Sequence, residues 1–529
     1  RGGPVRVMAV GATIIVSFTY VVAQIYAVGL IASRFTGVDF SVGIFLGLAS
    51  ILVCSFLGGM RAITWTQVAQ YIIILVAFLI PTIWLSAKHA DNPVPQLAYG
   101  SVLPKLAARE QAIIADPGER QVRGEFARRA AEYEQRIARL PQSWEEGRRE
   151  VQRRLDEARL RSASLAELRA AERSLAAYPR SVEEAARAWA EERRENLARA
   201  RPPEPHATPY PGNTQAESDI RRNNFLALVF CLMFGTAALP HILMRAYTTP
   251  NVNETRVSVF WTLFFILLIY LTIPALAVLA KYDIYSQLVG SHYTNLPTWI
   301  SYWANVDKVN PLISVGDING DGIVQLAELA IDGDVLVLAT PEIGGLPYVI
   351  SGLVAAGGLA AALSTADGLL LAISNALSHD IYYKIVDPAA STQKRVTISK
   401  LLLLAVAFIA AYAASTRPAD ILSLVGAAFS LAASTLFPPL VLGVFWKRAN
   451  HVGAISGMVA GFTVCLFYML HTTPIMGGNP GATWFHIAPM SAGVFGVPAG
   501  LLTIVLVSLA TAPPHRTSAG LVEYIRSPE

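Results

Sequence analysis

The sequence is poor in cysteine and, over most of its length, poor in charge. Its three cysteines, Cys54, Cys231 and Cys465, lie in apolar stretches without metal-ligand or disulfide spacing, so we expect them to be core residues. The formal net charge of +4 at pH 7 is too small to indicate a nucleic-acid partner. The apolar stretches contain no nucleophile–base pair and no zinc spacing, so the chain is expected not to be an enzyme. No cleavable signal peptide is recognisable, and because the chain begins at Arg1 we expect a fragment or a processed form.

The charge that is present is concentrated in one segment. Between Lys105 and Glu204 there are 22 Lys and Arg and 19 Asp and Glu residues, which is 41 of the 80 charged residues in the chain. Elsewhere, nearly uncharged apolar stretches recur that reach the ~18 residues needed for a helix to cross ~30 Å of hydrocarbon. The sequence therefore predicts an all-α, polytopic membrane protein with a soluble helical insert.

Ten membrane-spanning helices are predicted. Their ranges are 5–32, 40–60, 66–86, 223–248, 255–280, 347–380, 396–415, 420–446, 451–471 and 487–510. If the N-terminus is cytoplasmic, the short connections place thirteen Lys and Arg residues on the cytoplasmic side. The other side then has only four outside the insert, at Arg34, Lys281, Lys308 and Arg417. Because positive residues collect in cytoplasmic loops, we expect a multi-pass protein of the cell (inner) membrane with both ends of this chain in the cytoplasm.

These expectations divide the chain into six parts. They are three membrane helices (1–86), an extracytoplasmic charged helical insert with a linker (87–222), two membrane helices of which the first is broken (223–280), an extracytoplasmic loop (281–346), five membrane helices (347–510) and a cytoplasmic tail (511–529).

The insert contains the sequence signals that mark the starts of short helices. Three Ser-x-x-Glu sequences, at 143–146, 164–167 and 181–184, fit capping boxes, in which a hydroxyl and a carboxylate satisfy backbone donors at a helix start. The sequence predicts three or four amphipathic helices folded as a hairpin or a small bundle. Such a bundle is either a solvated helical domain without a functional site of its own or a docking surface for a partner protein.

The segment DINGDGIVQLAE, residues 317–328, has the twelve-residue spacing of an EF-hand calcium loop. Calcium takes about six to eight oxygen ligands. The predicted ligands are Asp317, Asn319, Asp321, the Ile323 carbonyl, Gln325 through a water, and Glu328. Because no full helix enters the loop, we expect a lone, structural Ca2+ site, the alternative being an accidental acidic turn.

A polar cluster interrupts the apolar run 347–380 at Ser364, Thr365 and Asp367. Sodium accepts neutral oxygens, and two hydroxyls together with the Ala361 carbonyl one turn earlier can converge on one point. The alternative is that both hydroxyls donate hydrogen bonds back to the preceding turn, as is common in membrane helices. That alternative does not account for Asp367, which is left open as a proton carrier, a second cation ligand or a residue paired with a neighbour.

The span 223–248 is expected to be broken. Gly235 and Thr236, followed by Pro240, interrupt it, and broken membrane helices offer free backbone groups at the depth where transporters bind substrate and ions. Gly235 and Thr236 are therefore the predicted substrate region, and a proline kink without a ligand is the competing account. Arg245 is expected to be an anchor at the cytoplasmic end rather than a substrate-binding residue.

Four ordered blocks resemble the sodium/solute symporter family and, within it, the cation/acetate symporter branch. They are GGMRAITWTQVAQ (58–70), MFGTAALPHILMRAYT (233–248), SGLVAAGGLAAALSTADGLLLAISNALSHDIYY (351–383) and GAAFSLAASTLFPPLVLGVFWKRAN (426–450). The resemblance implies the inverted-repeat fold shared with amino-acid/sodium symporters, and sodium ligands at Ala361, Ser364 and Thr365. It also implies that the chain starts at the family's fourth span, without the helix that completes the sodium shell. Gln67 stands where many relatives carry an Asp.

The sequence as a whole predicts a secondary active transporter in which sodium entry drives uptake of a small solute, by resemblance a short monocarboxylate such as acetate. Its partners would be the solute, sodium and the lipid bilayer. The alternative is a membrane sensor or scaffold whose insert binds a partner.

Overall fold

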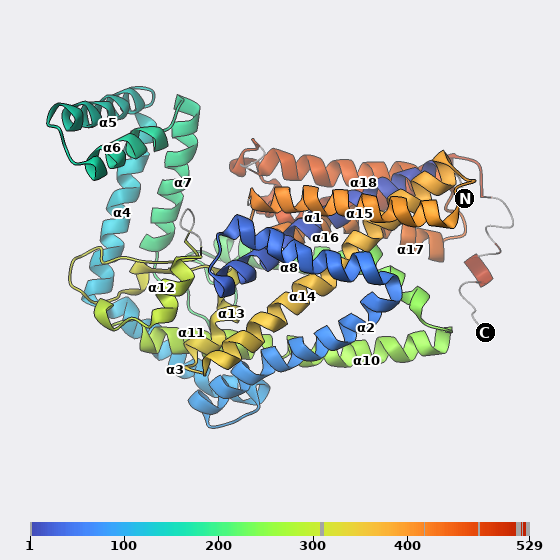
Figure 1. Cartoon of the computed structure of the whole chain (residues 1–529), viewed down its shortest axis with the longest axis horizontal. Helices are drawn as coiled ribbons and strands as arrows, with labels where there is room; N and C mark the ends of the chain where they lie inside the picture. The colour runs from blue at the N-terminus through green and yellow to red at the C-terminus, as the bar shows by residue number, and fades with distance from the viewer. Residues whose placement is uncertain are drawn as a thin grey trace.

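The computed structural model describes residues 3–306, 311–416, 418–473, 477–514, 520 and 522–524, and of residues 54–62 and 480 only the backbone. Several residues used in the charge count, Arg1, Lys308, Arg417, Arg516 and Arg526, lie outside the described residues, as does part of the predicted tail. The described chain is almost entirely helical, with long helices gathered in a bundle and an arm of shorter helices at one end of it (Figure 1).

The bundle is built from helices that precede the insert in the sequence and helices that follow it. Before the insert come α1 (Gly3–Thr36) and α2 (Phe40–Ala90); after it come α8 (Gln215–Thr236), α9 (Pro240–Leu243), the 3-10 segment η1 (Met244–Thr248), α10 (Val252–Tyr270), α11 (Ile273–Gln287), α14 (Tyr348–Asn375), the π-helical segment η4 (Ala376–Val386), α15 (Thr392–Ser415), α16 (Ile421–Thr435), α17 (Phe437–Phe445), α18 (His451–Thr472) and α19 (Gly493–Ala510). A segment between α11 and α14 contains α12 (Thr298–Ala304), the two-stranded antiparallel pair β1 (Ile313–Val315) and β2 (Leu329–Ile331), and α13 (Gly333–Ile343).

Eight of the helices in the described part of the chain are long and apolar enough to cross a membrane, or nine if the bent pair of α8 with α9 and η1 counts as one span. The predicted break within 223–248 is confirmed, because the two parts of this pair meet at an angle of 43°. Of the predicted span 40–60, the apolar part whose side chains are described is Phe40–Val53, inside the longer α2.

Close packing of the bundle depends on small residues. A Cβ atom at Gly357 of α14 would lie 2.5 Å from the Ala77 Cβ of α2, and one at Gly461 of α18 would lie 2.1 Å from the Ser434 carbonyl oxygen. Small residues let the two backbones approach closely, and the resulting dispersion contacts between the helices stabilise their association in a membrane. The main core forms where α1, α2, α14 and α15 meet. Cys231 and Cys465 are buried free thiols, as expected, and the side chain of Cys54 is outside the described ones.

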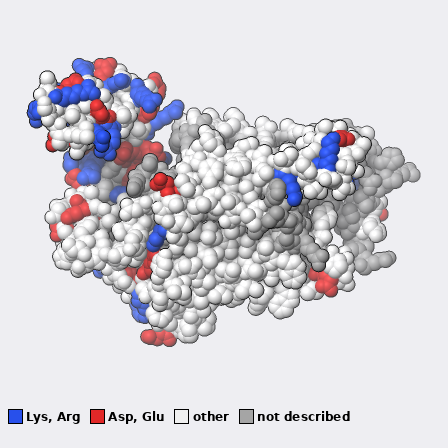
Figure 2. Space-filling view, in the orientation of Figure 1, with Lys and Arg blue, Asp and Glu red and all other residues white. Residues whose placement is uncertain are grey.

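The insert forms the arm. Its helices are α3 (Pro95–Ala115), α4 (Pro117–Ala138), α5 (Gln142–Leu160), α6 (Leu165–Ala177) and α7 (Val182–Ala200), with α4 packed on α7 and α5 on α6. Figure 2 shows that charged side chains gather on this arm while the visible face of the bundle is almost free of them. The arm therefore has a surface suited to water, and the visible face of the bundle has one suited to lipid.

The capping predictions in the insert had mixed outcomes. The capping box at Ser164 and Glu167 is confirmed, with both hydrogen bonds present, and Ser181 accepts from the Glu184 amide. The prediction at Ser143 was wrong. Helix α5 already begins at Gln142 behind Pro141, so Ser143 lies in the first turn and its hydroxyl donates to the Arg136 carbonyl instead.

Two buried ion pairs involve α11, one with α3 of the arm and one with α2 of the bundle. Lys281 Nζ of α11 lies 2.6 Å from Glu110 Oε1 of α3, and Lys88 Nζ of α2 lies 2.8 Å from Asp283 Oδ1 of α11. Both carboxylates are almost fully buried, so each needs its partner to offset the cost of desolvation.

Candidate functional site

The polar cluster on α14 brings three oxygen atoms together. The Ser364 and Thr365 hydroxyls lie 2.9 and 3.2 Å from the Ala361 carbonyl oxygen and both donate to it. Ala361 is exposed and the two hydroxyl residues are half-buried, so this face of α14 is only partly covered by the described chain. The arrangement matches both interpretations of the sequence, because back-bonded hydroxyls can also turn their lone pairs towards a cation.

Gln67 of α2 contacts the same turn of α14. Its side-chain amide donates to the Ser364 carbonyl at 2.7 Å. Sequence reasoning noted Gln67 only as a departure from a family pattern and did not predict this contact. A long-range hydrogen bond of this kind has no local signal in the sequence.

Asp367 is fully buried on the neighbouring face of α14. It interacts electrostatically with Arg245 of η1. Arg245 also packs against α14 beside Asp367, because a Cβ atom at the neighbouring Gly368 would lie 3.2 Å from Arg245 Nη2 and 3.6 Å from the His241 Cβ. Arg245 is half-buried and directed at α14, which differs from the expected anchor at a helix end.

His241 and Tyr20 extend this cluster, and the sequence analysis did not identify them. The Tyr20 ring of α1 packs edge-on against the His241 ring at 5.7 Å and against the Phe429 ring of α16 at 5.5 Å. The broken helix is thus held between α1, α14 and α16. A His one turn before an Arg in an apolar span was the sequence signal that could have identified the cluster.

The two residues of the predicted substrate region have different surroundings. At Gly235 a Cβ atom would lie 2.6 Å from the Phe429 carbonyl oxygen, so this glycine allows α8 to approach α16. Thr236, the last residue of α8, is exposed, and its hydroxyl donates to the Leu232 carbonyl at 2.7 Å. Helix α9 then begins at Pro240, which leaves a short non-helical link at the break.

A cavity of about 590 Å³ opens beside the broken helix. It lies between α1, the α9–η1 segment and the end of α14 with η4, and its polar lining includes Arg6, Thr13, Asn375, His379 and Asp380. Pro240 and Met244 line it from the broken helix, while His241 and Arg245 face α14. The cavity therefore reaches the segment that carries Arg245.

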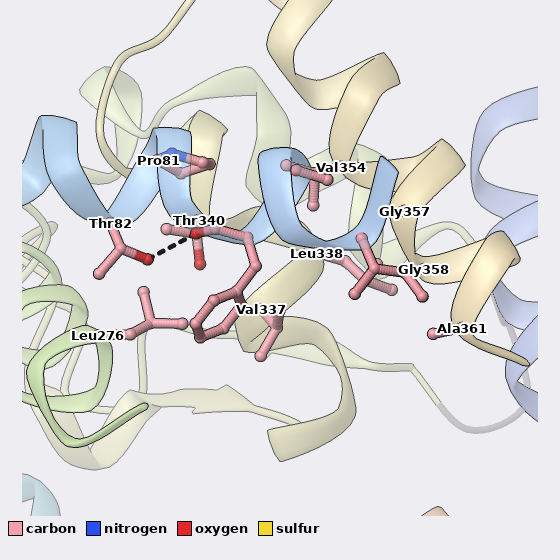
Figure 3. A pocket seen from close by; sticks show the side chains of 13 residues that line it. Pro81, Thr82, Leu276, Val337, Leu338, Thr340, Val354, Gly357, Gly358 and Ala361 are labelled. Carbon is pink, nitrogen blue, oxygen red and sulfur yellow. Dashed lines mark hydrogen bonds between the residues drawn. The ribbon is translucent and has the colours of Figure 1, made fainter. Parts of the chain in front are cut away.

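A second, smaller cavity of about 210 Å³ lies nearer the N-terminal end of α14 (Figure 3). Side chains of α2, α11, α13 and α14 line it, and Gly357, Gly358 and Ala361 form its α14 wall. The hydroxyls of Thr82 and Thr340 donate to carbonyls of their own helices, at Phe78 and Leu336. This cavity is apolar and borders the polar cluster at Ala361.

The loop 317–328 turns at two glycines in the left-handed conformation. Gly320 and Gly322 have φ values of +76° and +74°, and the Asp317 carboxylate accepts hydrogen bonds from both of their amides. The Asp321 carboxylate accepts from the Ile323 amide and from the side chains of Asn319 and Gln325.

Glu328, the predicted closing ligand, is buried and accepts from the Ile318 amide and the Tyr293 hydroxyl. Burial and this carboxylate raise the pKa of Tyr293. No group of three or more His, Cys, Asp or Glu side chains suited to a metal ion occurs among the described residues. Calcium binding at Asp317, Asn319, Asp321, Ile323, Gln325 and Glu328 stays a prediction.

Comparisons with known proteins agree on one family. A model of the sodium:solute symporter family matches residues 2–91 and 341–461. An uncharacterized symporter of Cupriavidus necator is 51% identical over 526 residues, covering 99% of this chain and 77% of the relative. A monocarboxylic acid transporter of Corynebacterium glutamicum is 26% identical over 313 residues, and an uncharacterized symporter of Bacillus subtilis 28% over 289 residues. The chain spans about half the length of these last two.

Among solved structures, a Na+-coupled sialic acid symporter in a substrate-bound, outward-open state matches with a TM-score of 0.51 at 15% identity. The match covers 97% of this chain and 76% of that one. At this identity the likeness shows the fold, and it confirms the predicted all-α, inverted-repeat transporter fold.

Proposed function

This chain belongs to the sodium:solute symporter family, and on that premise we propose that it forms the core of a transporter that couples sodium entry to uptake of a short monocarboxylate such as acetate. The family and the fold support sodium-coupled symport in a multi-pass membrane protein. The monocarboxylic acid transporter of C. glutamicum supports the class of solute. All of these relatives are described as symporters or transporters, which favours transport over a sensor or scaffold.

The observation that carries the proposal is the convergence of three oxygens on α14. The Ser364 and Thr365 hydroxyls lie 2.9 and 3.2 Å from the Ala361 carbonyl oxygen. These three oxygens are the proposed protein ligands of sodium. Neutral oxygens suit a monovalent ion because they replace its water without adding charge to the membrane interior. Gly235 and Thr236, at the break between α8 and α9, are proposed as part of the solute region.

The energy for uptake would come from the membrane potential and the sodium gradient. One sodium ion entering down ~100 mV gains about 2.3 kcal/mol, and this offsets the equal cost of bringing in one acetate anion against the same potential. Net accumulation of the anion would then come from the sodium concentration gradient or from a second sodium ion. The proposed movement is a rocking of the broken helix and α14 against a scaffold that includes α15 and α16. The proposed location is the inner membrane, with both ends of this chain in the cytoplasm.

Uptake of labelled acetate by proteoliposomes, with and without an inward sodium gradient, tests the proposal. The double substitution Ser364→Ala/Thr365→Ala should abolish the sodium-dependent component. The matched control is Ser258→Ala/Thr262→Ala on α10, where the Thr262 hydroxyl also donates one turn back, at 2.8 Å, but away from the cluster. Unchanged sodium-driven flux in the α14 variant would falsify the proposed ion site.

The loop 317–328 is proposed in addition to bind calcium in a structural role. The complete twelve-residue spacing and the left-handed glycines support it.

A further inference from the structure

The carboxylate of Asp367 lies between two positive charges of different kinds, one resident and one transported. The resident charge is Arg245, with which Asp367 interacts electrostatically across the contact between η1 and α14. The transported charge is the sodium proposed at Ala361, Ser364 and Thr365, on the preceding turn of the same helix. Residues three and four apart are neighbours on a helix surface, so Ser364 lies next to both Asp367 and Gly368.

A fully buried carboxylate in an apolar bundle requires a positive neighbour, and Asp367 has no exposed surface. When the sodium site is empty, Arg245 meets this requirement. When sodium is bound one turn away, the ion can serve as the positive neighbour of the Asp367 carboxylate. The electrostatic attraction between Asp367 and Arg245 then weakens. The low dielectric of the surroundings makes this exchange of charges strong.

Arg245 does not itself line the larger cavity, but it is half-buried and the preceding residue, Met244, does line it. The 590 Å³ cavity is lined by Pro240 and Met244 of the same segment and by Ala372, one turn after Gly368 on the same face of α14. A planar guanidinium forms two parallel hydrogen bonds with a carboxylate, which makes Arg the side chain best suited to bind a monocarboxylate.

We propose that Arg245 binds the carboxylate of the transported solute, and that sodium and Arg245 alternate as the counter-charge of Asp367. Sodium binding frees Arg245 for the solute, and loss of sodium returns Arg245 to Asp367 and expels the solute. The coupling of the two fluxes follows from this exchange. The inference rests on the proposed sodium-coupled monocarboxylate transport, for which it names the solute-binding residue and the coupling residue.

The first test is the sodium dependence of acetate binding. The protein in detergent or proteoliposomes is titrated with labelled acetate in sodium chloride and in choline chloride. The wild-type protein should bind acetate about tenfold or more tightly in sodium, the range expected for charge-assisted hydrogen bonds. In Asp367→Asn the affinity without sodium should rise to within about twofold of that with sodium, because nothing then competes for Arg245.

Two further variants separate this role from a structural one. Asp367→Glu keeps the charge and should keep the sodium dependence. Asp387→Asn, which removes the carboxylate that pairs with Lys394 and does not line the cavity, should also keep it.

The second test is Arg245 itself. Arg245→Gln should raise the KM for acetate about tenfold or more while binding of labelled sodium is retained, and Arg245→Lys should raise KM less. The two Arg245 variants still test the proposal if Asp367→Asn does not fold. Folding is judged by elution from a sizing column and by thermal unfolding.

The outcomes are distinct from those of the proposed function. If the wild-type protein accumulates acetate with a sodium gradient but Asp367→Asn keeps the full sodium dependence, or Arg245→Gln keeps the wild-type KM, this inference is overturned and the proposed function stands. If the wild-type protein binds acetate without sodium-driven accumulation, the proposed function fails and the binding measurements still test the exchange. If it binds no carboxylate, both fail.

Discussion

The side-chain amide of Gln67 on α2 donates a hydrogen bond to the backbone carbonyl of Ser364 on α14, 2.7 Å away. This bond connects the helix after the short α1–α2 turn with a helix almost three hundred residues later in the chain. It braces the turn that carries the proposed sodium ligands.

Removal of this brace should weaken sodium binding. Gln67→Met keeps the length of the side chain but loses the bond, which costs about 1 kcal/mol or roughly fivefold in an equilibrium constant. We expect the sodium concentration for half-maximal uptake to rise by that factor. Thr66→Val, which removes only a local bond to the Ile63 carbonyl, is the control. Equal sodium dependence in both variants would contradict the bracing role.

A buried network outside the main site should control stability. Arg34 Nη2, at the end of α1, lies 2.7 Å from Glu342 Oε1 of α13, and the Trp303 indole donates to the other Glu342 oxygen at 2.7 Å. Glu342→Ala leaves Arg34 buried without its partner and should cost about 3 kcal/mol of the free energy of unfolding. The exposed pair of Arg139 and Glu146 provides the comparison, and Glu146→Ala should cost less than about 1 kcal/mol. Thermal unfolding measures both, and similar losses would contradict the prediction.

Asp334 at the start of α13 should make stability depend on pH. Burial, followed by the charge of Asp332, raises its pKa to about 6 in the folded chain, with Asp420 adding to the effect. A carboxyl with a raised pKa binds more protons when folded than when unfolded, so its contribution to stability is favourable at low pH and is lost as the pH rises towards and through 6. Asp334→Asn should remove that loss and raise the unfolding temperature above pH 6.

The control for this prediction is Asp156→Asn on the exposed face of α5. It removes a carboxylate from the surface of the arm rather than from a buried position, so the unfolding temperature above pH 6 should stay close to that of the unmodified protein. An identical profile for Asp334→Asn and the unmodified protein would show that the carboxyl is not destabilised in the fold.

Calcium binding at the loop 317–328 is tested by titration of the whole chain with Ca2+ and Tb3+. We expect a dissociation constant on the order of 0.1 to 1 mM, as for extracellular single sites, and a higher unfolding temperature in millimolar Ca2+. Asp317→Asn/Asp321→Asn should remove both effects, and Asp156→Asn should remove neither. A thermal shift that persists in the loop variant would locate the ion elsewhere.

Local patterns predicted much of the fold because their causes are local. Long uncharged runs must form helices in a membrane, since each helix satisfies its own backbone donors and acceptors, and the structure has helices in all the predicted spans. The break at Gly235–Pro240 and the capping box at Ser164 likewise depend on neighbouring residues alone. Ser143 was the exception, because a proline two residues earlier had already started the helix.

The sequence by itself determined the helices, the charged arm and the set of three oxygens on one turn of α14, because these depend on residues within a few positions of one another. Only the tertiary structure decided what faces that turn: Gln67 at Ser364, and Arg245 with His241 against Asp367 and Gly368. Those contacts depend on how distant helices pack, and packing is set by the summed fit of many small residues rather than by any one of them.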